Sequence, residues 1–258
     1  MNNGTPYPRA TPPLGVNPLL ARLRREIGAL DGSGAAAEAG VVSLGLAPVD
    51  AALPWGGLPR AALHEITGPA QDGARLGFAV ALLARLRIGR PVLWCRTQSA
   101  LADHGALYGP GLAAAGVSPR QVIFVTVNKA ADALWVLEEG LRCNGLAAVV
   151  GEGIAPRFTD SRRLQLAARG GSTLGLLLPA ASAKPVPSAA LTRWHVTSVA
   201  SVGTGPALPR RAWRLALQHG RGVRPTAWHV EWKDAALCGA LAVPLADRSL
   251  EEPAVAVG

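Results

Sequence analysis

A glycine-rich stretch with the spacing of a phosphate loop runs from Gly68 to Arg75 and reads GPAQDGAR. It keeps the two glycines of a G-x-x-x-x-G-K-[ST] loop, Gly68 and Gly73, between an expected strand and an expected helix. Ala74, however, stands where such a loop has its phosphate-gripping lysine, and Arg75 stands where it has the hydroxyl that binds Mg²⁺. Backbone N–H groups could still hold an anion, but two glycines alone favour a structural turn.

Two further parts of a nucleotide hydrolase are displaced or missing. The acid that should end the fourth strand has its counterpart in Glu152, one residue late. Residues 94–98 (WCRTQ), which follow the second strand, contain no carboxylate to activate water. The sequence therefore predicts that the protein is not an enzyme. An ATPase that uses Arg75 in place of the lysine is the alternative.

Other catalytic arrangements have no support in the sequence. The five histidines are scattered without a pair at metal-ligand spacing, so no metal site and no cofactor are expected. The three cysteines are odd in number and form no Cys-x-x-Cys, which disfavours a disulfide framework and favours a reducing cytoplasm. Cys95, at an expected strand end, is interpreted as a buried apolar side chain.

The positive charge of the chain is concentrated in its second half. The net charge is +9, yet residues 41–152 hold nine basic and eight acidic residues, while residues 157–224 hold eleven basic residues and one acid. Such asymmetry is typical of a polyanion-binding surface, with a solvated arginine-rich face as the alternative. Tryptophans between the arginines are expected either to pack in the core or to stack on bases. The DNA-binding candidates are Arg162, Arg163, Arg210, Arg211, Arg214, Arg221 and Arg224.

Short apolar runs alternate with helical segments between residues 41 and 178, which predicts a doubly wound α/β domain. The runs are continuously apolar, as in parallel strands covered by helices on both faces. Three alternating segments near the end are predicted as antiparallel strands that extend the sheet. The predicted strands are 62–66, 91–95, 121–127, 146–150, 173–178, 193–199, 211–218 and 227–232, and the helices are 73–87, 100–115, 130–142 and 161–169.

The two ends of the chain differ in composition from this domain. Residues 1–16 are proline-rich and predicted to be disordered, residues 17–30 form an amphipathic helix, and residues 31–40 form a linker. The helix is expected to pack on the domain or to dock on a partner. The domain spans residues 41–234, and residues 235–258 are predicted to be a C-terminal tail. Neither a membrane span of about 18–20 apolar residues nor a secretory signal is predicted.

Several stretches resemble the RecA-type recombinase core. Residues 43–53 (SLGLAPVDAAL), the turn at 56–59 (GGLP) and residues 64–69 (HEITGP) are similar to its opening, and the resemblance extends over residues 42–233. A narrower resemblance is to the ImuA family, RecA-like mutagenesis proteins of bacteria that lack the Walker lysine. It rests on residues 91–95 (PVLWC), 107–112 (LYGPGL), 133–139 (ALWVLEE), 161–167 (SRRLQLA), 192–194 (TRW) and 228–232 (WHVEW).

The resemblance implies a RecA-like doubly wound, mostly parallel sheet flanked by helices and extended by antiparallel C-terminal strands. It also implies a non-hydrolysing, cytoplasmic adaptor in SOS-induced translesion DNA synthesis. Its partners would be ImuB, a catalytically inactive Y-family polymerase homologue, and an error-prone C-family DNA polymerase, with RecA and DNA as further candidates. The alternatives are a SulA-like inhibitor of cell division, which the basic C-terminal hairpin disfavours, and a weakly ATP-dependent RecA-type DNA-binding protein.

Overall fold

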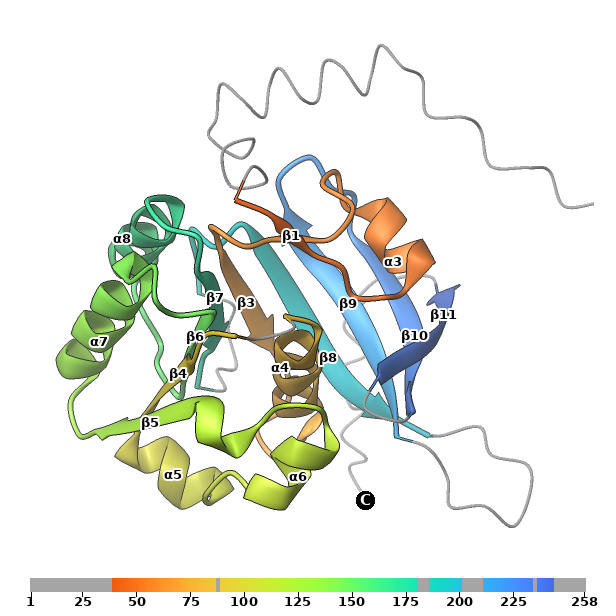
Figure 1. The fold of residues 1–258 in the computed structure, drawn as a ribbon. Helices are drawn as coiled ribbons and strands as arrows, with labels where there is room; N and C mark the ends of the chain where they lie inside the picture. Colours follow the sequence, from red (N-terminus) through yellow and green to blue (C-terminus); the bar gives the residue numbers. More distant parts are fainter. Residues whose placement is uncertain (1–38, 87–88, 181–185, 201–210, 234–235, 244–258) are drawn as a thin grey trace, which may run out of the picture.

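The computed structural model describes residues 39–86, 89–180, 186–200, 211–233 and 236–243. In these residues nine strands form one sheet, in the order β11-β10-β9-β8-β3-β7-β6-β4-β5 (Figure 1). The strands from β8 to β5 run parallel, and β9, β10 and β11 continue the sheet antiparallel. The strands are β3 Leu63–Thr67, β4 Val92–Thr97, β5 Val122–Val127, β6 Ala148–Glu152, β7 Leu174–Leu178, β8 Thr192–Val199, β9 Ala212–Gly220, β10 Thr226–Lys233 and β11 Ala236–Val243, beside a small pair, β1 Val41–Val42 and β2 Leu58–Pro59.

Helices cover both faces of the parallel half, which confirms the predicted doubly wound architecture. α7 (Ala130–Arg142) and α8 (Phe158–Arg169) pack on one face, and α4 (Ala74–Arg85) packs on the other (Figure 1). The short helices α5 (Gln98–His104) and α6 (Gly109–Ala114) follow the carboxyl end of β4, and α3 (Ala47–Ala52) lies against β11. None of the helices in the described ranges has the length and apolarity needed to cross a membrane.

Three predicted elements differ from the structure. The helix predicted at 100–115 is two helices, because Gly105 adopts φ +71° and ends α5, and α6 begins only at Gly109. Residues 193–199 lie in β8, which is antiparallel to β9 but parallel to β3. The predicted tail contains β11, since its apolar residues 236–243 pair with the edge of β10. The predicted disordered segment, the amphipathic helix and residues 31–38 of the linker lie outside the described residues.

The tryptophans of the antiparallel half belong to the core under α4. Trp194, Trp213 and Trp228 are at most 4% exposed, and the ring centroids of Trp194 and Trp228 lie 6.2 Å apart. Gly77 of α4 makes room for this packing, because an added Cβ would lie 2.5 Å from Cζ2 of Trp213. Of the two roles expected for the tryptophans, core packing is therefore correct for these three rings.

A buried histidine links β3 to β8. His64 is fully buried, with Nδ1 2.8 Å from Oγ1 of Thr192 and Nε2 2.8 Å from the carbonyl oxygen of Pro59. A carbonyl oxygen can only accept, so Nε2 donates to Pro59 and the Thr192 hydroxyl donates to Nδ1. Burial lowers the pKa of His64 to about 4, and the ring is neutral in the folded protein at neutral pH.

Candidate functional site

The predicted phosphate loop joins β3 to α4 at the carboxyl ends of the parallel strands, where open α/β sheets bind their ligands. Its first glycine is required by packing, because a Cβ on Gly68 would lie 2.4 Å from the carbonyl oxygen of Val196 on β8. The second glycine, Gly73, has open space around it and immediately precedes α4. Packing alone therefore explains why residue 68 is a glycine, without any bound ligand.

The carboxylate of Asp72 occupies the N-terminus of α4. Its Oδ1 accepts the backbone N–H of Ala74 at 2.9 Å and the hydroxyl of Ser198 at 2.6 Å. Its Oδ2 accepts the backbone N–H of Ser198 at 2.6 Å. N–H groups at a helix N-terminus are the groups that a phosphate loop offers to a bound anion. Here the protein's own carboxylate takes one of them.

These contacts keep Asp72 ionised. Burial raises the pKa of its carboxyl, but the hydrogen bonds from Ser198 and Ala74, with the charge of His195, outweigh burial and hold the pKa below its usual value. A fixed negative charge beside the loop repels phosphate, and Ala74 supplies no positive charge to offset it. Both features weaken the binding of a nucleotide.

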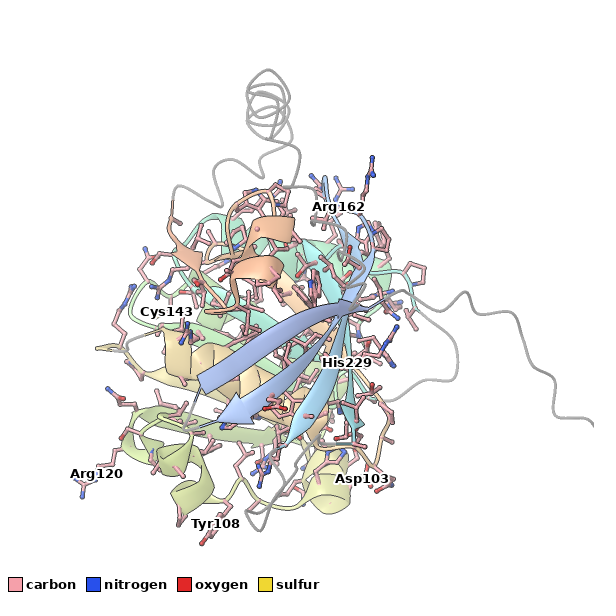
Figure 2. All side chains as sticks on the ribbon, turned by 90° about the vertical axis from the view of Figure 1, so that its right-hand side faces the viewer. Asp103, Tyr108, Arg120, Cys143, Arg162 and His229 are labelled. Atoms are coloured by element: carbon pink, nitrogen blue, oxygen red, sulfur yellow. The ribbon has the colours of Figure 1, made fainter. Side chains whose placement is uncertain are left out.

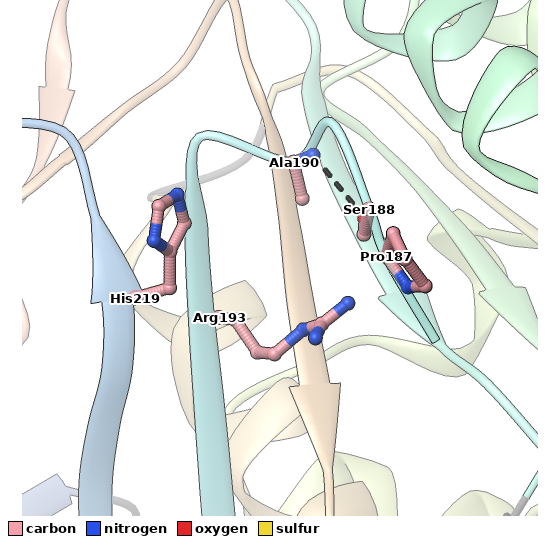
Figure 3. A pocket seen from close by; sticks show the side chains of 5 residues that line it. All are labelled: Pro187, Ser188, Ala190, Arg193 and His219. Carbon is pink, nitrogen blue, oxygen red and sulfur yellow. Dashed lines mark hydrogen bonds between the residues drawn. The ribbon is translucent and has the colours of Figure 1, made fainter. Parts of the chain in front are cut away.

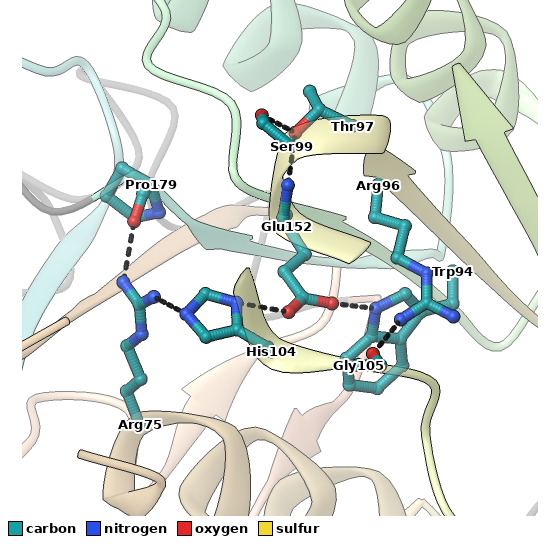
Figure 4. Close-up of polar contacts among 10 residues, drawn as sticks. Arg75, Trp94, Arg96, Thr97, Ser99, His104, Gly105, Glu152 and Pro179 are labelled. Atoms are coloured by element: carbon teal, nitrogen blue, oxygen red, sulfur yellow. Dashed lines mark hydrogen bonds and ion pairs between the residues drawn. The ribbon is translucent and has the colours of Figure 1, made fainter. Parts of the chain in front are cut away.

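Arg75 reaches into a polar network that links four elements of the fold (Figure 4). Its Nη1 donates to the carbonyl oxygen of Pro179 at 2.8 Å, and its Nη2 lies 3.2 Å from Nε2 of His104 on α5. The Nδ1 of His104 lies 3.3 Å from Oε1 of Glu152 on β6, and Oε2 of Glu152 accepts Nε1–H of Trp94 on β4 at 2.9 Å. Arg75 is only 4% exposed and Glu152 only 3%. Arg75 and Glu152 are therefore buried, while His104, which joins them, lies at the surface.

The direction of these hydrogen bonds fixes the tautomer of His104. A guanidinium only donates, so Nε2 accepts from Arg75 and the neutral ring carries its proton on Nδ1, which donates to Glu152. Burial lowers the pKa of Arg75, and the negative charge of Glu152 opposes this effect. In an active phosphate loop, the hydroxyl at this position and the strand-end acid hold Mg²⁺. Here a buried guanidinium supplies the positive charge instead.

The surroundings of the loop offer structural contacts where a hydrolase has catalytic ones. Oγ1 of Thr97 at the end of β4 accepts the N–H of Ala100 at 3.2 Å and caps α5. Arg96 is buried and donates from Nη1 to the carbonyl oxygen of Gly105 at 2.9 Å. Cys95 is buried, as predicted, and its burial raises the pKa of the thiol to about 11. Within the described residues, no cluster of His, Cys, Asp and Glu could hold a metal ion.

The arginines predicted to bind DNA do not share one surface. Arg211 precedes β9 at the carboxyl edge of the sheet, whereas Arg221 and Arg224 lie in the β9–β10 turn at the opposite edge. Ten residues of extended chain separate Arg211 from Arg221, which corresponds to roughly 30 Å. Arg214 lies between them on β9, and Arg210 is outside the described residues. Of the four candidates among them that the structure describes, Arg221 and Arg224 are the two that it places in one turn.

The two candidates on α8 have different surroundings. Nη2 of Arg163 binds Oε2 of Glu138 on α7 at 2.5 Å, and Nη2 of Arg142 binds Oε1 of the same carboxylate at 2.5 Å. Arg163 thus joins α8 to α7, and a carboxylate partly neutralises its charge. Arg162 is exposed on α8 (Figure 2). DNA binding by any of these arginines stays a prediction.

Sequence reasoning missed two residues of the site, Asp72 and His104. Asp72 had a signal, because an aspartate side chain commonly accepts the backbone N–H two residues further on. His104 had none, since it lies almost thirty residues after Arg75 and in no motif. Glu152, interpreted from the sequence as a displaced strand-end acid, lies in β6 and within the network.

Comparison with known proteins shows similarity both in sequence and in fold. The chain is 33% identical over 216 residues to proteins named ImuA from two strains of Caulobacter vibrioides, covering 76% of this chain and 84% of theirs. A crystal structure of the RadB recombinase superposes with a TM-score of 0.54 at 14% identity, covering 76% of this chain and 98% of that chain. No family model matches the sequence.

Proposed function

Because this chain belongs to the ImuA family and has a RecA-like fold, we propose that it is an accessory factor in SOS-induced, error-prone translesion DNA synthesis that acts without hydrolysing ATP. It would work in the cytoplasm as an adaptor for an ImuB-like Y-family polymerase homologue and an error-prone C-family DNA polymerase. RecA and DNA are further candidate partners. Family membership supports the pathway, and the net charge of +9 supports the contact with DNA.

The proposal that the protein does not hydrolyse ATP is supported by two charged side chains of its own, Asp72 and Arg75, which occupy the loop. A nucleotide phosphate would have to displace the Asp72 carboxylate from the N–H of Ala74. Mg²⁺ would have to compete with the buried guanidinium of Arg75, which reaches Glu152 through His104. Both costs are electrostatic and both oppose Mg-nucleotide, so they support a scaffold whose conformation does not depend on ATP.

Calorimetric titration of the full chain with Mg-ATP and Mg-ADP tests this part of the proposal. We expect no binding heat, no shift of the melting temperature and no phosphate release, with a RecA-type ATPase carrying an intact Walker loop as the positive control. Micromolar nucleotide binding would contradict the proposal and favour the weakly ATP-dependent alternative.

Complementation tests the cellular role. In a strain that lacks the gene, we expect the wild-type chain to restore ultraviolet-induced mutagenesis only when the error-prone C-family polymerase is present. Restoration without that polymerase would contradict the adaptor role. Filamentation on overexpression in cells without the polymerase would instead indicate a SulA-like division inhibitor.

Pull-down of the ImuB homologue locates the partner contact. Comparing the full chain with a chain that lacks residues 1–40 separates the predicted amphipathic helix from the RecA-like domain. Loss of recovery would place the contact in the N-terminal segment. Equal recovery would place it on the domain, and no recovery with either chain would contradict the adaptor role.

A further inference from the structure

The connections at the amino ends of the parallel strands are purely basic in the part of the chain that the structure describes. We call these connections the amino edge: residues 53–62, 89–91, 115–121, 143–147, 169–173, 186–191 and 220–225. None of them contains an aspartate or a glutamate, and together they contain Arg60, Arg90, Arg120, Arg169, Arg221 and Arg224. The β9–β10 turn, uppermost in Figure 1, is part of this edge.

Two of these arginines, Arg60 and Arg90, interact electrostatically, and neither forms an ion pair with a residue that the structure describes. Burial, and then the charge of Arg90, lower the pKa of Arg60. Arg90 is anchored by Nη1, which donates to the carbonyl oxygen of Asn144 at 2.6 Å and to Oγ of Ser172 at 3.3 Å. The Nε of Arg60 is buried and makes no hydrogen bond to a described residue. A phosphate oxygen would both reduce the repulsion and accept from a guanidinium.

A cavity of about 250 Å³ opens at the same edge, between the segment before β8 and the end of β9 (Figure 3). Arg193 lines it, but Nε and Nη2 of Arg193 bind the two carboxylate oxygens of Glu65, each at 3.2 Å, which neutralises that charge. His219, which also lines the cavity, precedes the exposed Arg221 by two residues. The cavity is thus a polar hollow beside the β9–β10 turn.

The opposite edge of the sheet lacks this one-sided charge. The loops and short helices at the carboxyl ends of the strands combine basic and acidic residues, among them Asp72, Asp103, Lys129, Arg157 and Arg211. The first turns of α7 and α8 add Asp132 and Asp160. A polyanion approaching the described surface is therefore attracted more strongly to the amino edge.

We propose that the amino edge is the DNA-binding surface of this protein, with Arg221 and Arg224 as outer phosphate contacts and Arg60 and Arg90 as an inner phosphate site. The inference deepens the proposed function and rests on it for the choice of DNA as the polyanion. It places the DNA away from the degenerate phosphate loop. Of the arginines predicted from the sequence, it retains only the pair in the β9–β10 turn.

Fluorescence anisotropy of labelled single-stranded DNA at several salt concentrations tests the surface. Four phosphate contacts, one for each of the four proposed arginines, correspond to a slope of about −2.8 in log K against log salt. Arg221→Gln/Arg224→Gln should reduce the slope by about 1.4 and weaken binding about 25-fold at 0.1 M salt. The matched control, Lys129→Gln/Arg211→Gln, removes the same charge from exposed positions at the carboxyl edge and should change the slope little.

Arg90→Gln tests the inner site, with thermal unfolding as a check of folding. We call Arg221→Gln/Arg224→Gln the turn variant. If Arg90→Gln unfolds, the comparison of the turn variant with its control decides whether the proposal holds. Equal losses in the turn variant and in the control would overturn the proposal, as would absence of binding by the wild type at low salt. Competition by polyglutamate as effective as competition by DNA would overturn it too, and would indicate an acidic protein as the partner.

Mutagenesis assays separate this inference from the proposed function. If the wild-type chain restores damage-induced mutagenesis but the turn variant binds DNA normally, only the amino-edge surface is wrong. If the amino edge binds DNA but the wild-type chain fails to restore mutagenesis, only the cellular role is wrong.

Discussion

Replacing Arg75 by methionine tests whether the loop has exchanged a ligand site for a structural one. The change keeps the length of the apolar stem and removes the guanidinium. It deletes the hydrogen bonds to Pro179 and His104, which are partly buried, and leaves the buried Glu152 without the nearby positive charge. A hydrogen bond made by a charged group contributes about 1.5–3 kcal/mol, so we expect the free energy of unfolding to fall by about 3 kcal/mol.

Urea denaturation followed by circular dichroism measures this change. For a domain of this size, the same loss corresponds to a melting temperature lower by roughly 10 °C. The control is Arg85→Met on the same helix, since the Nε of Arg85 makes one long contact of 3.3 Å to the carbonyl oxygen of Ser43 and should cost less than about 1 kcal/mol. A double-mutant cycle with His104→Ala should give a coupling energy of about 1 kcal/mol or more. Equal, small losses for the two arginine variants would refute the structural role of the network.

Three further predictions concern the core and the thiols. Between pH 6.5 and 4 the folded state binds fewer protons at His64 than the unfolded chain, so the free energy of unfolding falls with falling pH by up to about 3 kcal/mol. His64→Gln should remove this part of the pH dependence, measured by urea unfolding at pH 7 and 4.5, and an unchanged dependence would contradict the prediction. Gly77→Ala should lower the free energy of unfolding by about 1–3 kcal/mol because the added methyl group meets the ring of Trp213, whereas Gly73→Ala, in open space, should not. Similar melting temperatures for the two variants would count against this packing. In a background with the third cysteine replaced by serine, Cys143 should react with Ellman's reagent in the folded protein and Cys95 only after unfolding, so fast reaction of both thiols would be inconsistent with the buried site.

Much of the fold could be predicted because its signals are local. Continuous apolar runs such as residues 147–150 indicate parallel strands covered on both faces, and α7 occupies the predicted residues 130–142. The departures depend on tertiary context. Gly105 ends a helix that apolar periodicity alone would continue, and residues 236–243 become a strand because the edge of β10 is available for pairing.

The site was harder to predict because its key contacts join distant parts of the chain. The loss of the Walker residues was evident at Ala74 and Arg75, but the new partner of Arg75 lies 29 residues away at His104. Charge counting found the basic segment without its geometry. A nine-residue strand places Arg211 and Arg221 at opposite edges of the sheet, so arginines close in sequence cannot contact the same phosphates.

The two substituted loop positions are linked through charge. A lysine at position 74 alone would face the Asp72 carboxylate, which already accepts the N–H of that residue and the hydroxyl of Ser198. A hydroxyl at position 75 alone would remove the cation that offsets Glu152 and leave that carboxylate buried. Each single reversal therefore restores one part of a nucleotide site while breaking a contact that now stabilises the fold. This mutual dependence gives both substituted positions a structural role in the fold.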